Sequence, residues 1–311
     1  EPEQKLLFTA SYDADCDLDS KNSGRCWDLI SGKTLGFYRH TNERLSPESI
    51  DIVYENGRVY TGSDDGCAYQ WDISGEKKLL KYFSFNGCVR KIALSQAYFA
   101  AACTDGIVRV CFKHTGVFFR HFSHTDKDVR EVRISKDEKR IWTATDGGTV
   151  SCFNLLTGEL IYCRKVHPLW IWSVCLMNDE KILVTGSGDG TVAFLSAESG
   201  QILAQIYNLP VNNEFLVTCP SDQAFPTGFF YTTDTDLIQV FKENKELQTM
   251  ELLDLDNPER MKYINKYNLK NLIITKLKNN ENYNSLTENY VRNRKTINQI
   301  NNKSIPQMLK A

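Results

Sequence analysis

The residue types that most often carry catalysis are present in this sequence, but their spacing matches no catalytic motif. No P-loop, G-x-G-x-x-G, G-x-S-x-G or H-E-x-x-H pattern occurs. The five histidines fall in expected turns or beside an expected outer strand: His40, His114, His121, His124 and His167. The aspartates of the turns are typical backbone-bonding turn residues rather than acids or bases. We therefore predict a protein that is not an enzyme and that uses no cofactor.

The ten cysteines also point away from a chemical site. They include no C-x₂-C pair, so the spacing of a zinc site is missing, and we predict no metal. Most of them fall inside apolar runs, where a thiol packs as a small apolar group. We expect reduced core cysteines in a cytoplasmic protein, with disulfides or a reactive site as the open alternative.

No part of the sequence predicts a membrane segment. No run approaches the roughly 18 apolar residues that a transmembrane helix needs. The first residues lack the basic and apolar regions of a signal peptide. We expect a soluble chain without membrane association, and the missing initiator Met suggests processing or a longer parent chain.

Short apolar runs with a period of two recur through the first 250 residues, separated by Asn, Asp, Gly or Ser. The clearest example is His167–Gly200, where runs at 170–174, 182–184 and 191–195 flank a turn at Ser187–Gly190. This pattern is typical of short antiparallel strands joined by tight turns. One such sheet cannot bury both of its faces, so it needs neighbouring copies.

The end of the third strand recurs at an even spacing. It is marked at Trp27-Asp28, Trp71-Asp72, Cys111-Phe112, Phe153-Asn154, Leu195-Ser196 and, more weakly, Phe241-Lys242. The intervals are 44, 40, 42, 42 and 46 residues, close to the ~40–45 of a four-stranded propeller blade. An Asp-Gly turn precedes most of these points, and a Ser-Gly or Thr-Gly turn follows them. Together these features resemble the WD40 repeat family over roughly residues 6–250.

The resemblance implies an all-β WD40-like β-propeller of six recognisable blades over residues 1–253, or seven in a closed ring. The first unit begins at a second strand, so its inner strand is expected from an upstream segment or from 271–277. The sixth unit is weak, with strand candidates at 215–218, 228–232 and 237–241. Residues 254–311 are expected to form a basic, partly helical or linker-like extension. Asn257-Pro258-Glu259 predicts the start of a short helix.

The family stabilises its blades with a tetrad of His, Ser or Thr, Asp and Trp, and the resemblance carries this over to two units. His167, Ser187 and Asp189 match three members, while Leu195 replaces the indole. A whole tetrad is expected from a second set: His40, Ser63, Asp65 and Trp71.

In WD40 propellers, residues at the start of each inner strand line the narrow top face, where peptides and partner proteins dock. The matching positions here are Asp51, Arg90, Asp128, Arg130, Trp170 and Trp172. Trp and Arg are the residue types most enriched in interface hot spots. Because Ile171 and Val174 match the family's core pair, we expect both tryptophans to be exposed, with a role as core fillers as the alternative.

The small net charge hides two regions of opposite sign. Residues 1–257 hold 26 Lys/Arg and 36 Asp/Glu, a net charge of −10, whereas 258–311 hold 11 and 3, a net of +8. Arg292, Arg294 and Lys295 form the densest basic cluster and are candidate nucleic-acid contacts. An Asn- and Lys-rich linker or a segment lying against the acidic propeller are the alternatives.

These observations predict a non-enzymatic scaffold or adaptor that binds proteins or peptide segments within a larger hetero-complex. Two other functions stay open. The chain could be the ligand-recognition portion of a longer signalling or ATPase protein. It could also be a ribonucleoprotein component that contacts RNA through its C-terminal extension.

Overall fold

The computed structural model describes residues 5–10, 23–39, 49–73, 79–126, 128–209, 214–221, 228–244, 249–270, 273–274 and 277. The chain divides into two compact units. Unit 1 comprises Glu1–Cys175 and Thr185–Asp189, and unit 2 comprises Leu176–Val184 and Gly190–Ala311. The division expected at residue 253 stays a prediction.

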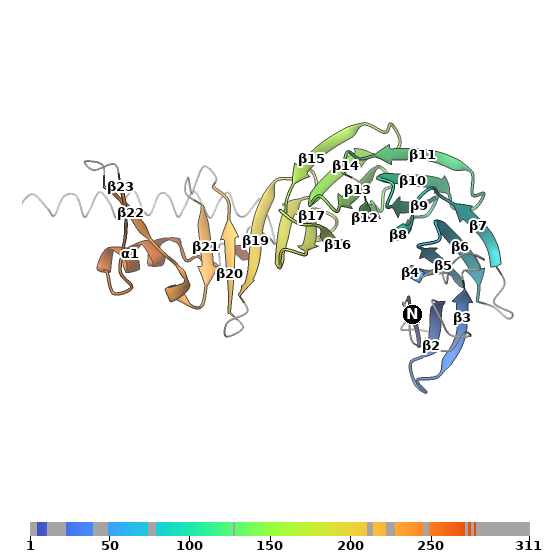
Figure 1. The fold of residues 1–311 in the computed structure, drawn as a ribbon, viewed down its shortest axis with the longest axis horizontal. Coiled ribbons are helices and arrows are strands. Elements are labelled where there is room, and N and C mark those ends of the chain that lie inside the picture. Colours follow the sequence, from blue (N-terminus) through green and yellow to red (C-terminus); the bar gives the residue numbers. More distant parts are fainter. Residues whose placement is uncertain are drawn as a thin grey trace, which may run out of the picture. The chain divides into compact units, whose positions relative to one another are not determined.

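Unit 1 is built from antiparallel sheets whose strands follow the order of the chain (Figure 1). The first sheet holds β1 (Leu6–Thr9), β2 (Ser23–Asp28) and β3 (Thr34–Arg39). The second holds β4 (Ser49–Glu55), β5 (Arg58–Ser63), β6 (Cys67–Asp72) and β7 (Leu79–Ser84). The third holds β8 (Val89–Leu94), β9 (Tyr98–Cys103), β10 (Ile107–Phe112) and β11 (Phe118–Ser123). The fourth holds β12 (Val129–Ile134), β13 (Arg140–Thr145), β14 (Thr149–Asn154) and β15 (Leu160–Lys165).

The sheets pack face to face because their middle strands are apolar on both sides. In β9 every residue is buried, and its alternate side chains belong to different cores. Phe99, Ala101 and Cys103 pack with the second sheet, whereas Ala100 and Ala102 pack with the fourth. A strand buried on both faces reads as a continuous apolar run, and YFAAAC is such a run.

Buried thiols take part in these cores, as expected from the sequence. Cys26, Cys67, Cys103, Cys111, Cys152 and Cys219 are buried. Burial raises the pKa of the Cys103 and Cys152 thiols to about 12. Such thiols stay protonated at neutral pH and are poor nucleophiles.

The recurring Asp-Gly turns have a common structural role. Gly66, Gly106, Gly148 and Gly190 adopt φ values of 79°, 82°, 72° and 82°, which favour glycine. The carbonyl groups of the first three accept hydrogen bonds from Phe85, His124 and Val166, each at the point where the chain leaves an outer strand. The turn therefore connects the middle of each sheet to the segment that leads to the next one.

Strands β16 (Ile171–Met177), β17 (Ile182–Ser187), β18 (Thr191–Ser196), β19 (Ile202–Leu209), β20 (Glu214–Cys219) and β21 (Phe229–Thr232) follow in one six-stranded sheet. A two-stranded sheet of β22 (Phe241–Asn244) and β23 (Thr249–Leu252) comes next. The weak sixth repeat therefore forms no separate four-stranded sheet among the described residues. The strand expected at 237–241 was wrong: a 3-10 helix, η1, spans Thr235–Leu237, and β22 begins at Phe241.

The predicted short helix is confirmed. Helix α1 spans Pro258–Tyr267, and the Asn257 side chain caps it by accepting from the Glu259 amide. The strand expected at 271–277 is not supported, because Ile273, Ile274 and Leu277 are helical. Within unit 2, Ile273 packs into a core with Val217 and Phe229 instead. No helix in the described parts of the chain is long and apolar enough to cross a membrane.

Candidate interaction site

The inner strands of unit 1 begin with a bulge that sets which side chains reach the surface. The pairing register shifts between Ser49 and Asp51, between Val89 and Lys91, and between Val129 and Glu131. The extra residue at the last two bulges is an arginine, Arg90 or Arg130. Bulges re-aim side chains and commonly lie beside functional sites. The apolar pair Ile171 and Val174 places Trp172 at the corresponding position of β16.

Aspartates hold both bulge arginines, Arg90 across neighbouring sheets and Arg130 within the fourth sheet. Arg90 donates from Nε and Nη2 to the two carboxylate oxygens of Asp128, at 3.3 and 3.1 Å. Arg130 donates from Nε to Asp146 at 2.6 Å, and its Nη2 lies 3.8 Å from Asp128. Asp128 has φ 66°, a left-handed conformation that Asp tolerates better than most residues. The guanidinium groups are thereby fixed in position.

Trp172 extends this row of charged residues with an exposed aromatic ring. Its side chain is 58% exposed, and the Arg130 guanidinium carbon lies 4.7 Å from its ring centroid. Trp170 meets Trp172 edge to face, with the centroids 6.0 Å apart and the planes at 81°. We call Arg90, Asp128, Arg130, Trp170 and Trp172 the tryptophan–arginine surface.

The expected exposure of the tryptophans is therefore met by only one of them. Trp170 is half-buried, with its Nε1 atom shielded from solvent. A Cβ atom on Gly188 would lie 2.1 Å from that nitrogen, so the glycine makes room for the indole. Trp170 packs edge to face against Trp172, and Trp172 is the more exposed of the two rings.

Asp51 does not belong to this surface, contrary to the expectation. It is 8% exposed and accepts hydrogen bonds from the Ile92 amide at 2.8 Å and from Lys91 Nζ at 2.9 Å. Lys91 and Glu131 occupy the position equivalent to Asp51 in the next two inner strands. The sequence did not identify these two residues as its equivalents. Asp51 lies one residue after the bulge residue of its strand, and its carboxylate joins two inner strands. Aligning Ile52 with Ile92 and Val132 would have revealed this equivalence.

The tetrad exists in a form that differs from the expected one. His167 is buried, with Nδ1 3.1 Å from Asp189 Oδ2 and Nε2 2.8 Å from Thr185 Oγ1. Thr185, not Ser187, therefore supplies the hydroxyl group. Ser187 donates instead to the Trp170 carbonyl at 2.9 Å. Thr185 lies in the middle of β17 beside the imidazole, whereas Ser187 is the last residue of β17, next to the turn.

The same correction applies to the second expected set. Trp71 Nε1 donates to Thr61 at 2.9 Å, while the Ser63 hydroxyl donates to Asp64. His40 lies outside the described residues. Threonine also takes this position in two other sheets: Thr9 accepts from Trp27, and Thr143 bonds His124. A threonine recurring in the second strand was the signal that could have identified it.

The protonation of His167 follows from its partners. Burial lowers its pKa, so the imidazole is neutral at pH 7. A carboxylate only accepts hydrogen bonds, so Nδ1–H donates to Asp189 and Nε2 accepts from Thr185 Oγ1–H. His124 has the same arrangement and the same direction of pKa shift, with the Gly106 carbonyl as acceptor.

This geometry predicts that Thr185→Val destabilises the protein more than Ser187→Ala. Loss of the Thr185 hydroxyl leaves a buried imidazole nitrogen without its donor, which costs about 1–3 kcal/mol. Ser187 is half-exposed and its partners can reach water, so its loss costs under about 1 kcal/mol. Urea unfolding followed by tryptophan fluorescence measures both. A larger loss for Ser187→Ala would contradict the assignment.

The predicted nucleic-acid contacts, Arg292, Arg294 and Lys295, lie outside the described residues. Within the described ranges, no group of three His, Cys, Asp or Glu side chains could hold a metal ion.

Comparison with known proteins connects this architecture to a family. The family model "WD domain, G-beta repeat" matches residues 158–194. Eukaryotic translation initiation factor 3 subunit I of Bombyx mori is 25% identical over 69% of this chain and 66% of its own length. An F-box/WD-40 repeat-containing protein of Arabidopsis thaliana is 21% identical over 57% of this chain and 42% of its own. Subunit 6 of the THO complex of the same plant is 24% identical over 53% and 47%.

The chain thus spans about two thirds or less of the length of these curated relatives. Among solved structures, a chain from the mitotic checkpoint complex aligns with a TM-score of 0.56 at 11% identity, covering 80% of this chain and 73% of that one. A computationally designed protein, Ika8, aligns with a TM-score of 0.53 at 18% identity, over 68% and 64%. These structural matches support the fold. The matched repeat, the repeat length and the Asp-Gly turns make this chain similar to WD40 repeat proteins, and the structural matches show a β-propeller type of fold.

Proposed function

We propose that this chain is a non-enzymatic interaction module that binds a protein or peptide segment through the tryptophan–arginine surface. The observation that carries the proposal is Trp172, a large ring left mostly exposed in a position that the surrounding residues hold firmly. Arg130 covers one part of it, and Trp170 supports its edge. Interface hot spots combine this kind of rigid aromatic anchor with arginine.

Membership of larger assemblies supports the same proposal. The WD40 relatives include subunits of a translation initiation factor and of the THO complex. Repeat propellers act on their partners by binding, and partly buried His124 and buried His167 serve as structural groups here. A scaffold role within a complex therefore accounts for both the family and the fixed surface.

Trp172→Ala is the direct test. Loss of a central aromatic anchor typically costs 2 kcal/mol or more, about a thirtyfold loss of affinity. The full chain, affinity-tagged in its native cells, is isolated with its complex and the associated proteins are quantified by mass spectrometry. Wild type and Trp172→Ala are compared with Leu169→Ala, an exposed residue of the preceding loop that serves as the control. The same partners in the same amounts for Trp172→Ala would rule this surface out.

A further inference from the structure

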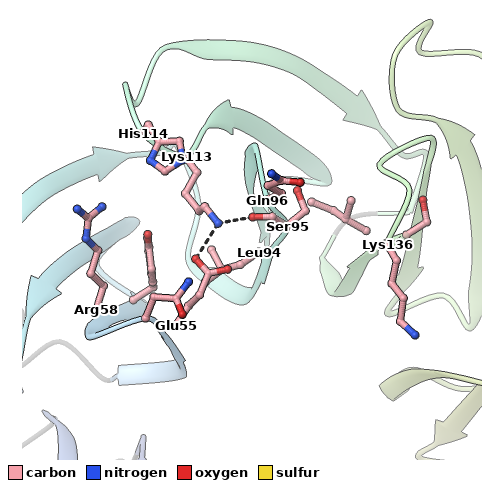
Figure 2. A pocket seen from close by; sticks show the side chains of 12 residues that line it. Glu55, Arg58, Leu94, Ser95, Gln96, Lys113, His114 and Lys136 are labelled. Atoms are coloured by element: carbon pink, nitrogen blue, oxygen red, sulfur yellow. Dashed lines mark hydrogen bonds and ion pairs between the residues drawn. The ribbon is translucent and has the colours of Figure 1, made fainter.

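A cavity of about 690 Å³ lies at the opposite ends of the inner strands from the tryptophan–arginine surface (Figure 2). It belongs wholly to unit 1. Residues from three successive sheets line it: Glu55, Asn56, Arg58, Tyr60, Leu94, Ser95, Gln96, Lys113, His114, Ile134, Ser135 and Lys136. Strands of six or seven residues span about 20 Å, so a ligand here cannot also touch Trp172.

An ion pair between buried Lys113 and partly exposed Glu55 forms the fixed part of this cavity. Lys113 is buried, and its Nζ donates to Glu55 Oε2 at 2.7 Å and to the Ser95 carbonyl. Figure 2 shows these contacts joining three segments of the lining. The pair brings β4 and the turn after β10 together. The cavity is thus held open by contacts between sheets rather than by one loop.

The lining is positively charged within an acidic part of the chain. It contains Arg58, Lys113 and Lys136 but one carboxylate, that of Glu55, which Lys113 already neutralises. Two other carboxylates of the same region do not line it. Asp137 accepts from Ser135, and Glu138 accepts from the Ala97 amide. Arg58 and Lys136 are exposed, so the accessible charge is cationic.

An apolar strip begins directly beside the cavity. Lys113 and His114 lie in the tight turn between Phe112 and Val117, whose backbone groups are hydrogen-bonded. Exposed apolar side chains follow on this hairpin and on the next one: Phe112, Val117, Phe118, Leu156 and Leu160. Arg120 joins the hairpins by donating to the carbonyls of Leu156 and Thr157, at 2.8 and 3.0 Å. We call the cavity and this strip the basic–apolar surface.

We propose that the basic–apolar surface is a second docking site, and that it takes an acidic amphipathic segment of a partner protein. Carboxylates of that segment enter the cavity beside Arg58 and Lys136, and its apolar side chains cover Phe118 and Leu160. Charge complementarity selects the acidic partner, because a basic segment would meet two exposed cations. Contiguous exposed apolar side chains rimmed by charge mark such sites. The proposal is independent of the tryptophan–arginine surface and would let one chain join two partners.

The test uses the full chain and a defined probe. A fluorescein-labelled peptide carries Glu on one helical face and Leu and Phe on the other, and a matched peptide has Lys in place of Glu. Fluorescence anisotropy is expected to detect binding of the Glu peptide that weakens with salt, and little binding of the Lys peptide. Arg58→Gln combined with Lys136→Gln is expected to weaken the Glu peptide at least about tenfold, and Phe118→Ser combined with Leu160→Ser about as much.

Two controls distinguish binding at this surface from nonspecific attraction to surface charge and from binding at the tryptophan–arginine surface. Lys139→Gln removes a cation that is 72% exposed but lies outside the cavity, and is expected to leave affinity unchanged. Trp172→Ala is also expected to leave the affinity for the Glu peptide unchanged, because Trp172 lies outside the basic–apolar surface. A failure of this second docking site can therefore be told apart from a failure of the proposed function. Circular dichroism confirms that each variant is folded. Absence of Glu-peptide binding, equal binding of both peptides, or equal losses for Lys139→Gln and the cavity pair would overturn the proposal.

Discussion

Gly148→Ala is expected to be among the most damaging single substitutions in this protein, lowering the free energy of unfolding by about 3–5 kcal/mol. Gly148 has φ 72°, and an added Cβ would lie 2.2 Å from the His167 carbonyl oxygen and 2.4 Å from that of Leu169. Both neighbours are backbone atoms that cannot rotate away. The variant must therefore break the hydrogen bonds from the Val166 and His167 amides to the Gly148 carbonyl.

Gly57→Ala separates the two causes of this loss. Gly57 has φ 75°, but no heavy atom lies within 4 Å of its added Cβ. It bears only the conformational cost of the left-handed region, about 1–2 kcal/mol. Urea denaturation of both variants, compared at equal slope, measures the difference. Equal losses would show that conformation alone, and not the approach of the 166–169 segment, requires glycine at position 148.

Wild-type stability is expected to fall as the pH rises from about 4.5 to 7 because of Glu131. Its carboxyl group is buried on β12, and burial raises its pKa from 4.5 to about 7, although Arg133 and Lys91 oppose the shift. Within this window the folded protein holds a proton that the unfolded chain has released, so stability decreases with pH and levels off above 7. The shift corresponds to about 3 kcal/mol.

Glu131→Gln is expected to remove this dependence. Near pH 5 the variant should match the wild type, whereas at pH 8 it should be more stable by up to about 3 kcal/mol. Arg133 keeps its hydrogen bonds to the carbonyls of Val174 and Val132, so loss of the carboxylate does not strand it. Asp137→Asn is the control, since the pKa of exposed Asp137 is lowered and its loss brings no gain at pH 8. Parallel profiles for the wild type and Glu131→Gln from pH 5 to 8 would contradict this role.

The sequence was sufficient for the class of fold because its signals are local. Period-two runs fix which strand faces are apolar, and the Asp-Gly turns fix where each strand ends. Helix α1 was predictable for the same reason, since Asn257 and Pro258 act within one turn of the chain. The incomplete first sheet was also visible, because the runs begin at what became β1 and no described strand precedes it.

The predictions from the sequence were wrong where a contact depended on how distant segments pack together. Alternation placed Thr185 and Ser187 on one face, but the depth of the imidazole decided that Thr185 bonds His167. The helical state of Ile273 was set by burial in the core of unit 2, which overrode the strand propensity of its segment.

The sequence by itself determined the repeat, its turns and the residue types at the start of each inner strand, since each depends on spacing within about 45 residues. Tertiary structure alone decided which of those residues meet. Arg90 reaches Asp128, Lys91 reaches Asp51 and Arg133 reaches the Val174 carbonyl across 38, 40 and 41 residues, one repeat length each. The bulges supply the physical reason. One extra residue in each inner strand turns Arg90 and Arg130 toward the surface and Asp51 into the interior. The residue types alone do not show where this extra residue lies, because the bulge is defined by pairing with the next strand.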